Sequence, residues 1–154
     1  MFYQQFFDSA FVFHACSANA LTPLVDNLRH HKSGIYYFNS SRVDDRSEFL
    51  KEISHTYSQN ISSTDNPNWD SVSDRLWHTL MAQPHENVAM IVNYCDQFIH
   101  RAFPLFLEFV EVFLRLSCTL FRNPEWPTAR SVCLRVILLG ETPAYPCIPA
   151  STTD

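Results

Sequence analysis

The chain has 154 residues, of which 46% are hydrophobic and 14% aromatic, and its formal net charge is −5. This length fits one domain with a sizeable core, and the apolar fraction excludes a disordered chain. The two glycines are too few for a glycine-rich phosphate-binding loop, and the acidic balance argues against a nucleic-acid-binding protein.

The first third of the chain predicts two strands and two helices in alternation. The apolar, β-leaning run 10–16 predicts the first strand. Residues 22–32 predict a helix that opens on a threonine N-cap followed by proline, and Gly34 is placed to close it. Residues 35–38 predict a second strand, and Ser47 caps the next helix.

The rest of the chain continues the alternation. The stretch 59–67 is rich in turn-forming residues and precedes a helix over 68–83. A buried strand is predicted at 88–94 and a long helix at 104–118. A turn-rich stretch then leads to the most hydrophobic strand, 132–139.

Short apolar strands that alternate with helices predict the α/β class with a small parallel sheet. The three strands at 35–38, 88–94 and 132–139 form its core, and the N-terminal run 10–16 adds a fourth. The long helix has a narrow polar stripe of Glu108, Glu111 and Arg115 and is apolar elsewhere. We therefore expect it to be covered on two sides, in part by the first thirty residues.

The excess negative charge lies in the middle of the chain. Residues 44–96 contain nine acids and three bases, a net charge of −6. In the helix at 68–83, Asn68 is a good N-cap and Asp70 complements the helix dipole. Asp70, Asp74 and Trp77 share one stripe, away from an apolar stripe that contains Trp69. The acidic stripe is consistent with a solvated surface or with an interface for a cationic partner.

The sequence NWDSVSDRLW at 68–77 resembles the N-[WL]-D-x-[LV]-x-D signature of barstar-like proteins, which are small intracellular inhibitors of secreted ribonucleases. The predicted elements on either side also follow the family's order. The resemblance spans 34–140, which leaves 1–33 as an N-terminal extension packed on the core and 141–154 as an irregular tail.

The resemblance implies a barstar-like fold whose signature helix blocks the active site of a nuclease. Acidic side chains there take the place of RNA phosphates, and Asn68, Asp70 and Asp74 match positions that face the nuclease. Two positions depart from the family. Ser73 replaces an aromatic residue, and Trp77 is our candidate for the missing aromatic anchor. The loop before the helix, which contains Asp65, lacks the family's aromatic-aromatic-glycine run.

The sequence offers little for metal binding or catalysis, so we expect no metal, no cofactor and no enzymatic activity. The side chains of His30 and His31 diverge on a helix, and no GxSxG motif occurs. His78 lies one turn after Asp74 and can pair with it. The five cysteines form no CxxC pair, and we expect them to be reduced and structural.

The resulting hypothesis is a cytoplasmic inhibitor, or immunity protein, of a bacterial toxin–antitoxin type. It is expected to be a monomer that binds one basic nuclease toxin domain, without direct contact to nucleic acid or membrane. Charged residues within the apolar run 98–121 exclude a bilayer helix there. Two alternatives remain: a barstar-fold module for a non-nuclease partner, and a small hydrolase. The neighbouring gene would discriminate among them.

Overall fold

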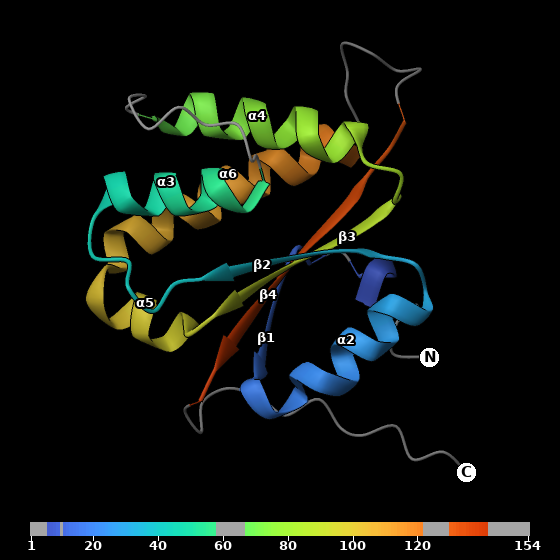
Figure 1. Cartoon of the computed structure of the whole chain (residues 1–154), viewed down its shortest axis with the longest axis horizontal. Helices are drawn as coiled ribbons and strands as arrows, with labels where there is room; N and C mark the ends of the chain where they lie inside the picture. Colours follow the sequence, from blue (N-terminus) through green and yellow to red (C-terminus); the bar gives the residue numbers. More distant parts are fainter. Residues whose placement is uncertain (1–5, 10, 58–66, 122–129, 142–154) are drawn as a thin grey trace.

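The computed structural model describes residues 6–9, 11–57, 67–121 and 130–141 (Figure 1). In chain order the elements are β1 (Phe13–Ser17), the short 3₁₀ turn η1 (Ala18–Ala20), α2 (Leu21–His30), β2 (Gly34–Asn39), α3 (Arg46–Tyr57), α4 (Trp69–Ala82), β3 (Asn87–Asn93), α5 (Cys95–Arg101), α6 (Phe103–Phe121) and β4 (Cys133–Gly140). The predicted α/β class is confirmed. The predicted turn-rich stretches and the C-terminal tail lie largely outside the described residues.

All four strands form one parallel sheet in the order β1-β4-β3-β2. The three predicted core strands are neighbours, with Tyr36 opposite Met90 and Met90 opposite Val136. The fourth strand from the N-terminal extension is also confirmed, because Phe13 lies opposite Val136 at the outer edge of β4. The described part of the extension therefore completes the sheet.

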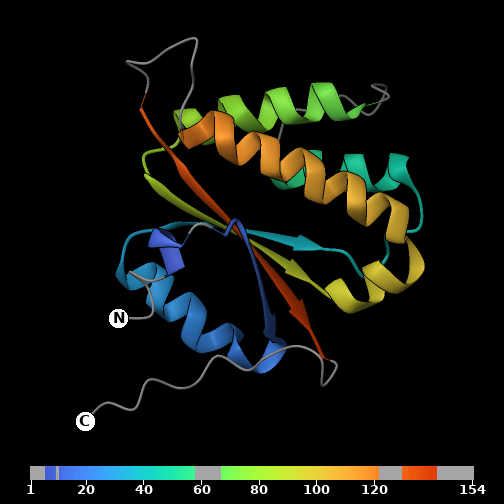
Figure 2. The same ribbon diagram turned by 180° about the vertical axis from the view of Figure 1, so that it is seen from behind.

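The central strands are apolar on both faces, as a parallel sheet covered on both sides requires. Val88, Met90 and Val92 face the larger core cluster, together with side chains of α3, α4, α5 and α6. Ala89 and Ile91 face the opposite cluster, which contains α2 and the N-terminal Phe6 and Phe7. Figures 1 and 2 show these two helical layers on opposite sides of the sheet.

The direction in which the chain crosses the sheet accounts for these layers. From β1 the chain crosses to the far edge at β2, and it then returns step by step through β3 to β4. Parallel crossovers are almost always right-handed, so crossovers in opposite directions place their helices on opposite faces. This is why α2 lies on the face of the sheet opposite α3–α6.

The long helix is covered on two sides, as predicted, but by the sheet and α4, so the predicted cover by the first thirty residues is largely wrong. Among the described residues, the N-terminal extension places α2 on the other face of the sheet. The segment before β1 lies beside the end of α6, and the Phe13 and Phe109 rings meet edge to face at 5.9 Å. The outer face of α6 keeps large apolar side chains exposed, among them Phe103 and Leu107. The crossover rule explains the error, because it directs α2 away from α6.

The predicted start and the predicted end of the first helix also need correction. The first helix begins after η1 at Leu21 with Ala20 as its N-cap, so Thr22 is not the cap. It ends without Gly34, because Lys32 adopts the left-handed conformation with φ 54°. The Lys32 N–H donates to the Arg29 carbonyl at 3.0 Å, a helix ending usually built with glycine.

The short helix α5 was not predicted. It fills the segment between the strand predicted at 88–94 and the long helix. Tyr94 is its N-cap with left-handed backbone at φ 58° and ψ 36°. Ala102 leaves helical geometry before α6 begins, so the apolar run that starts at Phe98 is divided into two helices.

Arg135 on β4 holds the N-terminal segment against the sheet. Its guanidinium donates to the carbonyl oxygens of Phe6 at 3.2 Å, Phe7 at 2.7 Å and Ser9 at 2.6 Å. Phe6 and Phe7 are buried in the cluster that also contains α2. One charged side chain thus satisfies three carbonyls of the segment that precedes β1.

We predict that Arg135→Met lowers the free energy of unfolding by about 2–4 kcal/mol, because a charged donor is lost to several partly buried acceptors. Urea unfolding followed by circular dichroism measures this change. Arg115→Met is the matched control, since Arg115 belongs to an exposed ion pair with Glu111 on α6. We expect the control to remain close to wild-type stability. Equal losses in both variants would contradict this role for Arg135.

Candidate functional site

The start of α4 is fixed by a reciprocal hydrogen-bond cap. Asn68 is the N-cap, as predicted, with φ −116° and ψ 170°. Its side-chain oxygen accepts from the Ser71 N–H at 2.8 Å, and the Ser71 hydroxyl lies 3.2 Å from the Asn68 N–H, which donates to it. The side-chain oxygen of Asn68 is therefore committed to the helix start.

Two carboxylates of α4 are exposed on its outer face. Asp70 lies in the first turn, and Asp74 follows one turn later with 74% of its side chain exposed. His78 stands 3.7 Å from Asp74 and is itself largely exposed, so the pair predicted from the sequence is present. Among the described residues, no lysine or arginine forms an ion pair with either carboxylate. We call Asp70 and Asp74 the acidic face of α4.

Ser73 and Trp77 contribute less to this face than predicted. The Ser73 hydroxyl donates to the Asp70 carbonyl oxygen at 3.2 Å, within the helix. Trp77 is half-buried and packs against the larger core cluster, and its ring meets the His78 ring edge to face at 5.1 Å. Trp77 therefore lies beside the acidic face and is partly covered by the core. The predicted Asp65 lies outside the described residues.

Three helices are joined beside the acidic face by a hydrogen-bonded cluster that the sequence did not reveal. The Trp69 indole donates to a Glu108 carboxylate oxygen at 2.8 Å, between α4 and α6. Arg46 at the start of α3 donates to the same carboxylate through both Nε, at 2.9 Å, and Nη2. We call Arg46, Trp69 and Glu108 the three-helix clasp. Glu108 was visible in the sequence as part of a polar stripe, but its partners are distant in the chain.

The contacts of the clasp shift the pKa values of Glu108 and Arg46. The hydrogen bond from Arg46 is the main cause that lowers the pKa of Glu108 below its ordinary value, and burial opposes it. The Trp69 hydrogen bond and the charge of Arg46 lower it further. The same hydrogen bond raises the pKa of Arg46. The clasp is therefore a charged contact in the folded protein.

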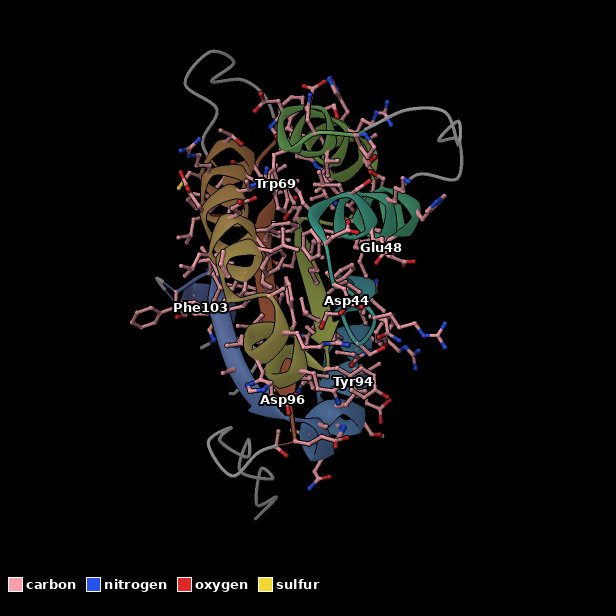
Figure 3. The ribbon with its side chains drawn as sticks, turned by 90° about the vertical axis from the view of Figure 1, so that its left-hand side faces the viewer. Asp44, Glu48, Trp69, Tyr94, Asp96 and Phe103 are labelled. Atoms are coloured by element: carbon pink, nitrogen blue, oxygen red, sulfur yellow. The ribbon has the colours of Figure 1, made fainter. Side chains whose placement is uncertain are left out.

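A cleft of about 640 Å³ lies at the carboxyl ends of β2 and β3. Asn39 and Tyr94 line it at the strand ends, and Glu48, Lys51 and Glu52 line it from α3. Figure 3 shows this end of the molecule, with Tyr94 and Glu48 labelled. The carboxyl ends of parallel strands commonly hold ligands, so the ends of the predicted strands were the feature of the sequence that could have indicated this region.

The charges around the cleft largely compensate one another. Arg42 and Lys51 line the cleft beside Glu48 and Glu52, so two charges of each sign face it. Lys51 and the two glutamates of α3 are all exposed. The cleft therefore presents no concentrated charge, whereas the acidic face of α4 has two neighbouring carboxylates of one sign.

The described residues contain no group of three or more histidine, cysteine or acidic side chains arranged to hold a metal ion. No described helix is long and apolar enough to cross a membrane. The described cysteines are free: Cys16 and Cys95 are buried and Cys118 is exposed. Burial raises the pKa of the Cys16 thiol to about 11, so this thiol is protonated at neutral pH.

Comparison with known proteins provides no family assignment. No family model matches the sequence, and no curated protein matches it significantly.

We predict that the clasp makes stability depend on acid pH. A lowered folded-state pKa favours the ionised carboxyl, so this stabilisation is present above the ordinary value of 4.5 and is lost as pH falls through the lower folded-state value. Glu108→Gln should therefore lose less thermal stability than wild type between about pH 6 and about pH 3. Thermal unfolding at both pH values measures the difference.

Arg46→Met is the second variant, because it removes the main cause of the Glu108 shift. It should flatten the same pH dependence while leaving the carboxyl in place. Parallel pH profiles for wild type and both variants would contradict a stabilising role for the charged clasp.

Proposed function

We propose that this chain is a protein inhibitor that binds a basic ribonuclease and blocks its active site with the acidic face of α4. The observation that carries the proposal is the exposure of Asp70 and Asp74 on one helix face, without a lysine or arginine partner among the described residues. Such carboxylates are available to cations of another molecule. A nuclease that binds RNA phosphates supplies those cations.

The order of the elements supports the proposal. The chain from β2 to β4 alternates one strand with two helices, and the signature sequence opens the second helix after β2. Apart from the additional short helix α5, this is the order that the resemblance to barstar-like proteins implies. Asp74 matches the aspartate that takes the place of a phosphate in that family, and it lies well beyond the helix start, where capping plays no part.

The acidic face is presented on a fixed support. The Asn68 cap sets the first turn of α4, and Trp69 is held by Glu108 on α6. Val72 and Leu76 of the same helix are buried in the larger cluster. A helix fixed in this way loses little conformational freedom when it binds, so more of the charge attraction contributes to affinity.

The electrostatic balance of the chain agrees with a basic partner. Residues 44–96 have a net charge of −6, and this segment includes α3 and α4. Asp44 and Asp45 precede α3 and are exposed, as are Glu48 and Glu52 within it. Neighbouring bases offset part of this charge, and the net negative charge that remains on the segment forms an acidic surface that favours rapid encounter with a cationic protein.

The test is inhibition of RNA cleavage by the nuclease domain encoded beside this gene. We predict that the wild-type chain blocks cleavage and that Asp74→Asn weakens binding by about 2–5 kcal/mol, because buried cations of the nuclease lose their partner. Calorimetric titration measures the affinity, and thermal unfolding checks the fold. The midpoint should be nearly unchanged, since Asp74 is exposed.

Asp26→Asn is the matched control, because Asp26 is an exposed aspartate on α2, on the opposite face of the sheet. It removes the same charge and should leave affinity close to wild type. Asp70→Asn should weaken binding less than Asp74→Asn, because Asp70 also stabilises the helix start. Equal affinity of wild type and Asp74→Asn would show that α4 does not block the nuclease. A protein captured in place of the nuclease would favour a module for another partner.

We predict that added salt slows association with the nuclease. Charges are screened over about 10 Å at 0.1 M ionic strength and over about 3 Å at 1 M, so steering by the acidic surface weakens as salt rises. Stopped-flow measurement over this range gives the association rate constant. A rate constant that does not change with salt would exclude the acidic surface as the source of steering.

A further inference from the structure

The cleft at the carboxyl ends of β2 and β3 is large enough for a small molecule. Its volume of about 640 Å³ lies within the range of about 300–1,000 Å³ that small-molecule sites occupy. It is lined by residues at the ends of two neighbouring strands, by the loop after β2 and by one face of α3. Side chains from separate parts of the chain therefore meet around one open volume.

Hydrogen bonds between the two strand ends fix one side of the cleft. Ser40, which follows β2, is fully buried, and its hydroxyl donates to the Asn93 carbonyl at 2.6 Å. Arg101 on α5 donates to the carbonyls of Ser40, at 3.3 Å, and Ser41. The loop 40–44 is therefore held in place before a ligand arrives. A site that is fixed in advance loses little conformational freedom on binding.

One face of α3 presents two short polar rows to the cleft. Glu48 and Glu52 lie one turn apart and form an acidic row, and Lys51 and His55 form the neighbouring row with the same spacing. Arg42, in the loop after β2, adds a second permanent positive charge to the lining. The cleft thus presents charges of both signs, and on α3 these charges are separated by row.

The charged side chains of the cleft do not neutralise one another in pairs. The ion pairs that the described residues form lie elsewhere, and none of them includes Arg42, Glu48, Lys51 or Glu52. All four side chains are exposed. A ligand that carries both a positive and a negative group can therefore pair with them without breaking an ion pair of the folded chain.

Tyr94 gives the cleft an aromatic wall. It follows β3, is 40% exposed and lines the cleft together with Asn39. Its backbone is left-handed, with φ 58° and ψ 36°, a conformation that is rare for bulky residues. Glycine adopts this backbone at no steric cost, and residues held in such conformations are frequent at functional sites. The presence of tyrosine here therefore points to a role for its ring.

We propose that the cleft binds a small zwitterion with a flat apolar group, of which an aromatic amino acid is the simplest example. The ammonium group of the ligand pairs with Glu48 and Glu52, and its carboxylate pairs with Lys51 and Arg42. The ring of the ligand lies against Tyr94. Figure 3 shows Glu48 and Tyr94 on the same side of this end of the molecule.

The charge balance favours a zwitterion over an ion of one sign. A simple cation would pair with the acidic row of α3 but would lie close to Lys51. A simple anion would pair with Lys51 but would lie close to Glu48 and Glu52. Like charges placed together reduce the affinity gained from the opposite charges. A zwitterion avoids this loss and forms charge-assisted hydrogen bonds at both of its ends.

Titration of the full chain with L-phenylalanine, followed by nuclear magnetic resonance of the backbone amides, tests the proposal. We expect saturable shifts at Ser41, Val43 and Tyr94, which line the cleft. Phenethylamine lacks the carboxylate and 3-phenylpropionate lacks the ammonium group, so each should bind about 10-fold more weakly. The absence of saturable shifts with L-phenylalanine would overturn the proposal. Binding of either analogue as tightly as L-phenylalanine would also overturn it.

Charge variants test each end of the ligand separately. Arg42→Gln combined with Lys51→Gln should weaken binding of L-phenylalanine about 10-fold without weakening that of phenethylamine, which has no carboxylate. Glu48→Gln combined with Glu52→Gln should weaken L-phenylalanine similarly without weakening 3-phenylpropionate. The four side chains are exposed, so thermal unfolding should show a retained fold. Variants that bind L-phenylalanine as wild type does would contradict the assigned charge pairs.

Tyr94→Gly separates a role in binding from a role in folding. Glycine adopts the left-handed backbone readily, so the thermal midpoint should be retained while binding of L-phenylalanine weakens about fivefold. Tyr94→Phe is the matched control, because it keeps the ring and should bind as wild type does. Undiminished binding in Tyr94→Gly would remove the ring from the site. These measurements involve no nuclease, so their outcome is independent of the proposed inhibition.

Discussion

The hand of the parallel crossovers is the constraint on which the other features depend. The chain crosses from β1 to β2 in one direction and returns through β3 to β4 in the other, so α2 lies on one face and α3–α6 lie on the opposite face. The same rule leaves β1 at the edge beside β4. It also brings the starts of α3, α4 and α5 to the carboxyl ends of the strands, where the acidic residues gather.

The strands could be predicted because continuous apolar runs in the local sequence indicate that they are buried. Val88 to Val92 are fully buried on both faces, and such a run has few alternatives to a central parallel strand. The helix ends were harder to predict. Lys32 adopts a left-handed conformation that favours glycine, and Ala102 interrupts an apolar run without proline at that position. The backbone of Lys32 has no signal in its own residue type, whereas Pro104 marks the start of the helix that follows the break.

The features of the candidate site likewise fall into those that the local sequence predicts and those that it does not. The N-cap Asn68 and the exposure of Asp74 follow from neighbours within one helix, so spacing alone predicts them. The three-helix clasp joins Arg46, Trp69 and Glu108, which lie up to 62 residues apart. No local pattern indicates that pairing. The apolar residues of α6 were visible in the sequence, but the sequence did not reveal that α2 would lie on the other face of the sheet.

The acidic face of α4 and the exposed apolar side chains of α6 make opposite physical demands on one small fold. The acidic face is stable in water while it is free, because its carboxylates remain hydrated and are stabilised further only by cations. The apolar side chains of α6, among them Phe103 and Leu107, expose area that water disfavours whether or not a nuclease is present. A contact through the acidic face therefore suits a conditional association.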